Sequence, residues 1–153
     1  MSINVDQFRQ WALAPAMATA ARFGPPVTDV ASALLIGIFS QETHLGEYLH
    51  QLDGPGLGIG SMQPLTLMNV LRTMPSLLVE AIRQPETAPT DQIVADLRFA
   101  CVTARWYLWI QPQQLPPDTS PASLWVAYRD MWCRGCRATE DQFIANCRTY
   151  GNL

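Results

Sequence analysis

The feature that most restricts the fold of this chain is an apolar segment in its first third, DVASALLIGIFSQET, from Asp29 to Thr43. Apolar residues lie nearly all round the helix that this segment would form, so the helix is expected to be buried instead of lying at the surface. Thr28 or Asp29 provides an N-cap, and the helix is expected to end between Thr43 and Gly46. We therefore predict a buried central helix against which the rest of the chain packs.

Proline and glycine residues divide most of the remaining chain into helical segments whose apolar residues follow helical spacing. Ser120 before Pro121 indicates a helix start, and Thr139 with Gln142 has the form of a capping box. We predict a mainly α-helical fold in one domain spanning residues 1–153. The expected surrounding helices cover residues 5–13, 14–22, 64–72, 75–83, 91–110, 121–132 and 139–151, with a linker at 111–120.

The segment from Glu47 to Gly60 lacks the composition of a helix. It contains Gly54, Gly56, Gly58 and Gly60 together with a proline, a composition that destabilises a helix. A short loop or β-hairpin is therefore predicted directly after the central helix.

Composition excludes several classes of function. The chain has 153 residues, of which 48% are hydrophobic and 15% charged, so we expect a folded globular protein. A formal net charge of -3 gives no basic surface for nucleic acid. The longest uninterrupted apolar run, Ala33–Phe39, is too short to span a bilayer. The first residues lack the pattern of a secretory signal, so synthesis in a cytoplasm is expected.

Four cysteines occur in the chain: Cys101, Cys133, Cys136 and Cys147. Cys133 and Cys136 form a C-x-x-C motif, but no strand precedes it as in a thioredoxin-like protein, and no further ligands stand at zinc-finger spacing. Buried or unused thiols are the favoured interpretation, with a structural disulfide or a metal clip as the alternative. We predict no metal site and no cofactor.

Glu42 is the residue that most directly indicates chemistry. It lies at the C-terminal edge of the apolar helix, where burial and the negative end of the helix dipole both disfavour the ionised carboxylate. The pKa of Glu42 should therefore be raised. A carboxylic acid that stays protonated near neutral pH can donate a proton to the leaving oxygen of a glycosidic bond. The alternative is an ordinary solvated glutamate in the last turn.

The residues around Glu42 resemble the lysozyme-like superfamily, and within it the lytic transglycosylases and related phage-encoded muramidases. An apolar helix ending in SQET is similar to the family helix that ends in Glu-Ser or Glu-Thr. GIGSMQP is close to the Gly-Leu-Met-Gln pattern, although Ser61 replaces the usual leucine, and Thr66 follows Gln63 by three residues. Further on, ARWYLW and WVAYRDMW resemble two helices of the family, but the Asn that usually follows the tyrosine is absent from the second.

This resemblance implies roles for particular residues. Glu42 would be the catalytic acid, and Tyr128 would donate a hydrogen bond to it. Substrate contacts would come from Gly58, Gly60, Ser61, Met62, Gln63 and Thr66, with the glycines allowing the backbone to approach a sugar closely. Three tryptophans, Trp109, Trp125 and Trp132, either stack on sugar rings or pack in the core.

The substrate that the resemblance implies is the peptidoglycan glycan strand. Lytic transglycosylases cleave the β-1,4 bond between N-acetylmuramic acid and N-acetylglucosamine with a single glutamate and leave a 1,6-anhydro product. A hydrolytic muramidase would need a second carboxylate, for which Asp53 is the candidate, although Asp53 also suits a turn. A non-catalytic phage structural or wall-binding protein is a further alternative.

The resemblance also suggests where such a protein works. We expect a monomer that acts on the wall, either as an endolysin released through a membrane lesion or as a virion component.

Overall fold

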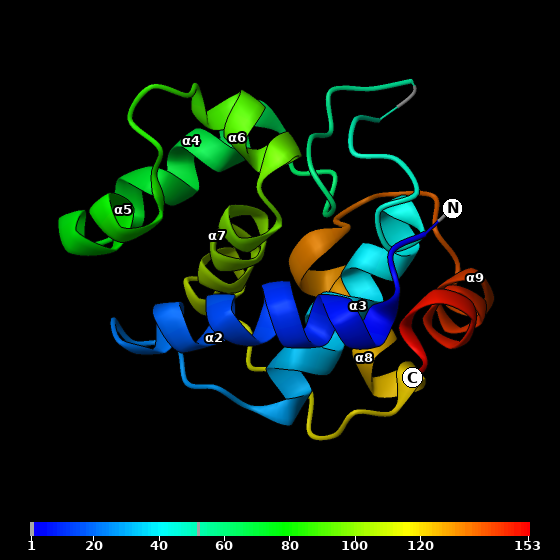
Figure 1. Ribbon diagram of the computed structural model, residues 1–153. Helices are drawn as coiled ribbons and strands as arrows, with labels where there is room; N and C mark the ends of the chain where they lie inside the picture. Colours follow the sequence, from blue (N-terminus) through cyan, green and yellow to red (C-terminus); the bar gives the residue numbers. More distant parts are fainter. Residues whose placement is uncertain (1, 52) are drawn as a thin grey trace.

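The computed structural model describes residues 2–51 and 53–153 and is mainly helical (Figure 1). No β-strand forms within these residues, and none of their helices has the length and apolar character to cross a bilayer. The elements in chain order are α1 (Val5–Phe8), η1 (Arg9–Leu13), α2 (Ala14–Ala21), α3 (Asp29–Thr43), α4 (Pro64–Thr73), α5 (Ser76–Ile82), α6 (Pro89–Ala95), α7 (Leu97–Trp109), α8 (Pro121–Ala127), η2 (Tyr128–Trp132), α9 (Glu140–Asn146) and η3 (Cys147–Gly151); the η elements are wide π-helical turns.

Helix α3 is the predicted central helix. The hydroxyl of Thr28 caps its start by accepting a hydrogen bond from the amide of Ala31 at 3.1 Å. All residues from Ala33 to Ser40 are buried. Helices α7, α8 and α9 and the turns η2 and η3 all contact α3, so the apolar character of every face of α3 is explained by neighbours on several sides.

The other helices form two groups around this centre (Figure 1). Helices α4, α5 and α6 lie against α7, which also packs along α2. On the other side, α8 and α9 pack against each other and against α3. Residues from the C-terminal end of α3, the loop that follows it, the start of α4 and the segment after η2 line one groove.

The predicted helix over residues 91–110 is wrong in its extent, because the structure has two helices there. Asp96 has extended backbone angles (φ -120°, ψ 101°) and separates α6 from α7. Its carboxylate accepts hydrogen bonds at 3.0 Å from the amides of Arg98 and Phe99 and so caps the start of α7. The aspartate stabilises a new helix start in preference to continuing the old helix. Helix α6 also begins at Pro89, one residue before the predicted cap.

The predicted helices 5–13 and 14–22 join instead into one continuous helical run, with η1 between α1 and α2. Within this wide turn the amide of Ala14 donates to the carbonyl of Arg9. Pro15 follows at once, and its ring would clash with the carbonyl four residues earlier in a regular helix. A π turn widens the helix at this point, and the chain continues in the same direction.

The glycine-rich segment is a loop with two isolated antiparallel bridges, His50 with Leu57 and Leu57 with Met62. The amides and carbonyls of Leu57 and Met62 exchange two hydrogen bonds of 2.9 Å. Leu57 thus pairs both with His50, which precedes it in the loop, and with Met62, which follows it. This compact double turn brings residues 51 and 61–63 to the end of α3.

Candidate functional site

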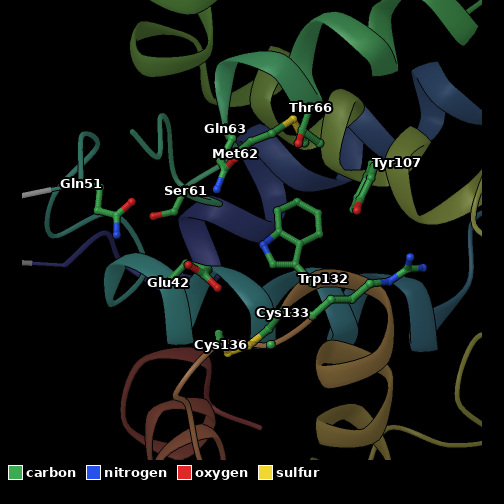
Figure 2. A pocket seen from close by; sticks show the side chains of 12 residues that line it. Glu42, Gln51, Ser61, Met62, Gln63, Thr66, Tyr107, Trp132, Cys133 and Cys136 are labelled. Atoms are coloured by element: carbon green, nitrogen blue, oxygen red, sulfur yellow. A yellow bond between two sulfur atoms is a disulfide. The ribbon is translucent and has the colours of Figure 1, made fainter. Parts of the chain in front are cut away.

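A groove of about 450 Å³ opens at the C-terminal end of α3 (Figure 2). Its volume is within the range of small-molecule sites in proteins. Figure 2 shows Glu42 rising from α3 on one side, with Gln63 and Thr66 on the opposite side. The lining residues are Glu42, Gln51, Ser61, Met62, Gln63, Thr66, Tyr107, Trp132, Cys133, Arg134, Gly135 and Cys136.

Glu42 is the only acidic residue among those that line this groove in the described part of the chain. It is partly buried, and burial raises the pKa of its carboxyl from the ordinary value of 4.5 to about 6. The hydrogen bond from Tyr128 lowers the same pKa and offsets part of that effect. The raised pKa predicted from the helix pattern is confirmed, with desolvation as its main cause. About half of Glu42 therefore carries a proton at pH 6, and about a tenth does at pH 7.

The predicted hydrogen bond from Tyr128 to Glu42 is present, with 2.7 Å between the phenol oxygen and Oε1. Tyr128 is only 2% exposed, and its ring stacks on Phe143 with centroids 4.9 Å apart. Gly37 of α3 permits this arrangement, because a Cβ there would lie 2.9 Å from the Phe143 ring. Burial and the neighbouring Glu42 both raise the pKa of the Tyr128 phenol, so it remains a proton donor in the hydrogen bond.

The chain turns sharply after Glu42 and is held by Thr43. Its buried hydroxyl donates to the Ile59 carbonyl at 2.8 Å and accepts from the amide of Gly46 at 3.0 Å. His44 and Leu45 both adopt left-handed angles, with φ of 52° and 54°. Such angles are unfavourable for residues other than glycine and persist only where surrounding contacts impose them. The turn therefore fixes the direction in which α3 presents Glu42.

The backbone of Glu42 has a second tyrosine partner. The hydroxyl of Tyr48 donates to the Glu42 carbonyl at 2.9 Å. Tyr48 and Tyr128 thus hold the backbone and the side chain of Glu42 separately. Both the position and the orientation of the carboxyl group are restrained before any ligand binds.

Four of the predicted substrate-contact residues line the groove: Ser61, Met62, Gln63 and Thr66. Ser61 has a left-handed φ of 48° and ends the glycine loop. Met62 is only 4% exposed, so it offers little surface to a ligand, whereas Gln63 is exposed. Thr66 lies on the first turn of α4. The loop and the start of α4 together form the wall opposite Glu42.

Gly58 and Gly60 do not line the groove, and the structure gives their lack of a side chain a different reason from the predicted one. Both are buried. A Cβ on Gly58, where φ is +69°, would lie 2.5 Å from the Ile93 carbonyl, and one on Gly60 would lie 3.0 Å from the Trp132 ring. These glycines permit close packing of the loop on its own protein and not, as predicted, close approach to a sugar.

Asp53 is exposed in a turn of the loop and does not line the groove. This placement matches the turn interpretation. Within the described residues, the groove thus has one carboxylate and no second one across from it.

The three tryptophans have three different environments. Trp125 is buried in the core. Trp109 is 47% exposed but lies outside the groove, near Gly24 and the buried Arg105. Trp132 lines the groove, where its indole N–H donates to the Gly60 carbonyl at 3.2 Å. Only Trp132 is therefore placed to contact a ligand in the groove.

Sequence reasoning missed several further groove residues, among them Gln51 and Tyr107. The side-chain oxygen Oε1 of Gln51 accepts a hydrogen bond from the amide of Gly56 at 3.0 Å, which lays the side chain across the glycine turn. Tyr107 packs edge-on against Trp132 with centroids 5.3 Å apart. The ARWYLW motif includes Tyr107, but nothing in helical spacing shows that this face of α7 borders the groove.

The favoured interpretation of Cys133 and Cys136 as unused thiols is wrong, because they form a disulfide at the edge of the groove (Figure 2). The path of the backbone between the two cysteines explains why they pair. The segment leaves η2 at Cys133 and turns at Gly135, where φ is +78°. That turn brings Cys136, the fourth residue of the motif, back towards Cys133, the first. Cys101 and Cys147 are free and buried, as expected, and burial raises the pKa of the Cys147 thiol to about 12.

No metal-binding cluster of three or more His, Cys, Asp or Glu side chains occurs within residues 2–51 and 53–153. Comparison with protein-family models, with characterised proteins and with solved structures gives no match to this chain.

Proposed function

We propose that this protein cleaves the glycan strands of peptidoglycan at the β-1,4 bond between N-acetylmuramic acid and N-acetylglucosamine, with Glu42 as acid and then as base. The observation that carries the proposal is the partly buried carboxyl group of Glu42 at a polar groove, held by Tyr128 and with a pKa raised to about 6. A group that gives up a proton and takes one back near neutral pH suits this reaction.

In the first step protonated Glu42 donates its proton to the bridging oxygen as the glycosidic bond breaks. Positive charge develops on the sugar ring, and Glu42 is now a carboxylate next to it. The second step returns the proton to Glu42. The 6-hydroxyl of the same muramic acid residue attacks the anomeric carbon, the carboxylate accepts the hydroxyl proton, and a 1,6-anhydro ring forms. The hydrogen bond from Tyr128 stabilises the carboxylate between the two steps.

The intramolecular route is favoured over hydrolysis because, among the described residues, Glu42 is the only carboxylate that lines the groove. Retaining and inverting glycosidases place a second carboxylate across the scissile bond from the acid, about 5 to 9.5 Å away. Asp53, the candidate for this role, is exposed in a turn outside the groove. When a hydroxyl group of the substrate is the nucleophile, no water molecule takes part, and no second carboxylate is needed to activate one. We therefore propose that Asp53→Asn keeps its activity.

The groove offers suitable contacts for an amino sugar. Acetamido and hydroxyl groups of a glycan strand pair with amide and hydroxyl side chains, which Gln51, Gln63 and Thr66 supply. Tyr107 and Trp132 present aromatic surface for the apolar face of a sugar ring. A mixed polar and aromatic lining of this kind is typical of small-molecule sites.

The proposal is tested by following the loss of turbidity of purified cell-wall sacculi. Glu42→Gln removes the transferable proton and keeps the shape of the side chain, so we expect a loss of about 10²-fold to 10⁴-fold in rate. Glu80→Gln is the matched control, because Glu80 is exposed on α5 and is not among the groove residues. A folded Glu42→Gln protein that clears sacculi as fast as the control variant would refute the assignment. Absence of clearing by every form would instead favour a non-catalytic wall-binding protein.

A further inference from the structure

The segment between η2 and α9 contains a four-residue loop that the proposed reaction does not use. Cys133 and Cys136 close this loop by a disulfide, and all four residues from Cys133 to Cys136 line the groove. Cys133 is buried at 7% exposure, whereas Cys136 is exposed to solvent. One sulfur of the bond is thus accessible to a reagent and the other is anchored in the protein.

This disulfide is next to the groups that hold Glu42. The Cys136 sulfur lies 3.9 Å from the Tyr128 hydroxyl, which in turn lies 2.7 Å from Oε1 of Glu42. The Cys133 amide also donates to the Tyr128 carbonyl at 2.9 Å. The two ends of the loop therefore contact the side chain and the backbone of the same tyrosine.

The loop has little other support. Gly135 has no atom within 4 Å of the position of a Cβ, and Arg134, Gly135 and Cys136 are exposed. Arg134 bonds to the Asp130 carbonyl and to Gln111, and the Cys136 amide donates to the Cys133 carbonyl at 3.2 Å. A short exposed segment with so few contacts has low local stability, and the disulfide is the one covalent restraint on it.

We propose that the Cys133–Cys136 disulfide is a redox-controlled positioning element, which holds the Tyr128–Glu42 pair and the groove wall in the reactive arrangement only while it is oxidised. This inference rests on the proposed function. It names the regulation of the same site: cleavage would be slow in a reducing cytoplasm and would become fast where disulfides persist, outside the inner membrane.

The switching step is thiol–disulfide exchange with a dithiol. A thiolate of the reductant attacks the exposed Cys136 sulfur, the S–S bond breaks, and Cys133 leaves as a thiolate that takes up a proton. The second thiol of the reductant then attacks the mixed disulfide and releases Cys136. The dithiol becomes a disulfide, having supplied two electrons and two protons, and the protein holds two thiols. Air or a disulfide reagent reverses the step.

The test compares the oxidised full chain, the same chain treated with dithiothreitol, and a Cys133→Ser/Cys136→Ser variant. Alkylation and mass spectrometry count the free thiols in each sample. Displacement of catalytic groups by about 1 Å costs on the order of 10²-fold in rate. We therefore expect the release of soluble fragments from peptidoglycan to fall by roughly 10-fold to 100-fold on reduction and to recover on reoxidation. The double variant should be slow with and without dithiothreitol.

A second measurement does not depend on turnover. Carbon NMR of the Glu42 carboxyl gives its pKa in both states, and circular dichroism checks that each sample is folded. We expect reduction to admit water to the site and to move this pKa towards its ordinary value. A Glu42 pKa and a cleavage rate that are both unchanged in protein shown to be reduced would overturn the inference. A redox-dependent pKa in a protein that cleaves nothing would refute the proposed function and leave the coupling intact.

Discussion

Replacing Glu42 by glutamine should stabilise the folded protein, and the gain should depend on pH. Burial raises the pKa of Glu42 from 4.5 to about 6, so the folded state disfavours the carboxylate that exists at pH 8. Each unit of pKa corresponds to about 1.4 kcal/mol, so the free-energy cost of this carboxylate in the folded state is about 2 kcal/mol. Glutamine has no charge to bury and still offers Tyr128 an oxygen acceptor.

The direction of this pH dependence follows from the difference in proton binding between the unfolded and the folded state. The unfolded chain releases the Glu42 proton near pH 4.5, whereas the folded protein holds it until about pH 6. The stability that comes from the protonated form is fully present below pH 4.5 and is lost as the pH rises through 6. The glutamine variant should therefore exceed the wild type by about 2 kcal/mol at pH 8 and by almost nothing at pH 4.

Urea unfolding at pH 4 and pH 8 measures this difference directly. In thermal unfolding, about 2 kcal/mol corresponds to an increase of roughly 4 to 8 °C in Tm at pH 8 for a chain of this length. The control Glu80→Gln changes an exposed side chain and should stay within about 0.5 kcal/mol at both pH values. A Glu42→Gln variant that is less stable than the wild type at pH 8, or that gains equally at both pH values, would refute the account of Glu42 as a desolvated acid.

Three further outcomes follow from the site and from the two loops that border it. Tyr128→Phe removes the hydrogen bond that lowers the pKa of Glu42, so the alkaline limb of the pH–activity profile should move to higher pH as the maximal rate falls; an unmoved limb would contradict the role of Tyr128. Gly58→Ala forces a Cβ into the Ile93 carbonyl at a left-handed position and should cost about 2 to 4 kcal/mol in urea unfolding. Gly135→Ala has the same strained backbone but open space, and should cost only about 1 kcal/mol.

Local patterns were sufficient to predict the central elements of the fold. The helix from Asp29 to Thr43 follows from an apolar run behind a Thr28 cap, and both are confirmed. The capping box of Thr139 and Gln142 is also confirmed. These signals lie within single helices and their caps, so no knowledge of the tertiary structure is needed to interpret them.

The features that sequence reasoning missed depend on where the chain turns and on how its segments pack, neither of which helical spacing reveals. The helix break at Asp96 is helped by Gln92, whose buried amide donates to the Asp96 carboxylate and to the Ile82 carbonyl. Gly58 is needed because α6 lies against the loop, which no periodicity in residues 54–60 reveals. The Cys133–Cys136 disulfide depends on how the chain leaves η2, and spacing alone allows several alternatives for a C-x-x-C motif.

The candidate site likewise contains some features that the sequence alone predicts and others that it does not. The position of Glu42 at the end of a buried helix was enough to predict its raised pKa, and resemblance to the lysozyme-like family suggested Tyr128 as its partner. The sequence did not indicate that Gln51 and Tyr107 would join the groove. Both reach it through the packing of separate segments around α3.

The mass of the fragments released from purified peptidoglycan tests the central claim most directly. With the oxidised wild-type protein we expect muropeptides that end in 1,6-anhydro-muramic acid, each lighter by one water than the product of hydrolysis, and we expect almost none from Glu42→Gln. Fragments with ordinary reducing ends, or equal release by the two proteins, would contradict a mechanism in which Glu42 alone transfers the proton.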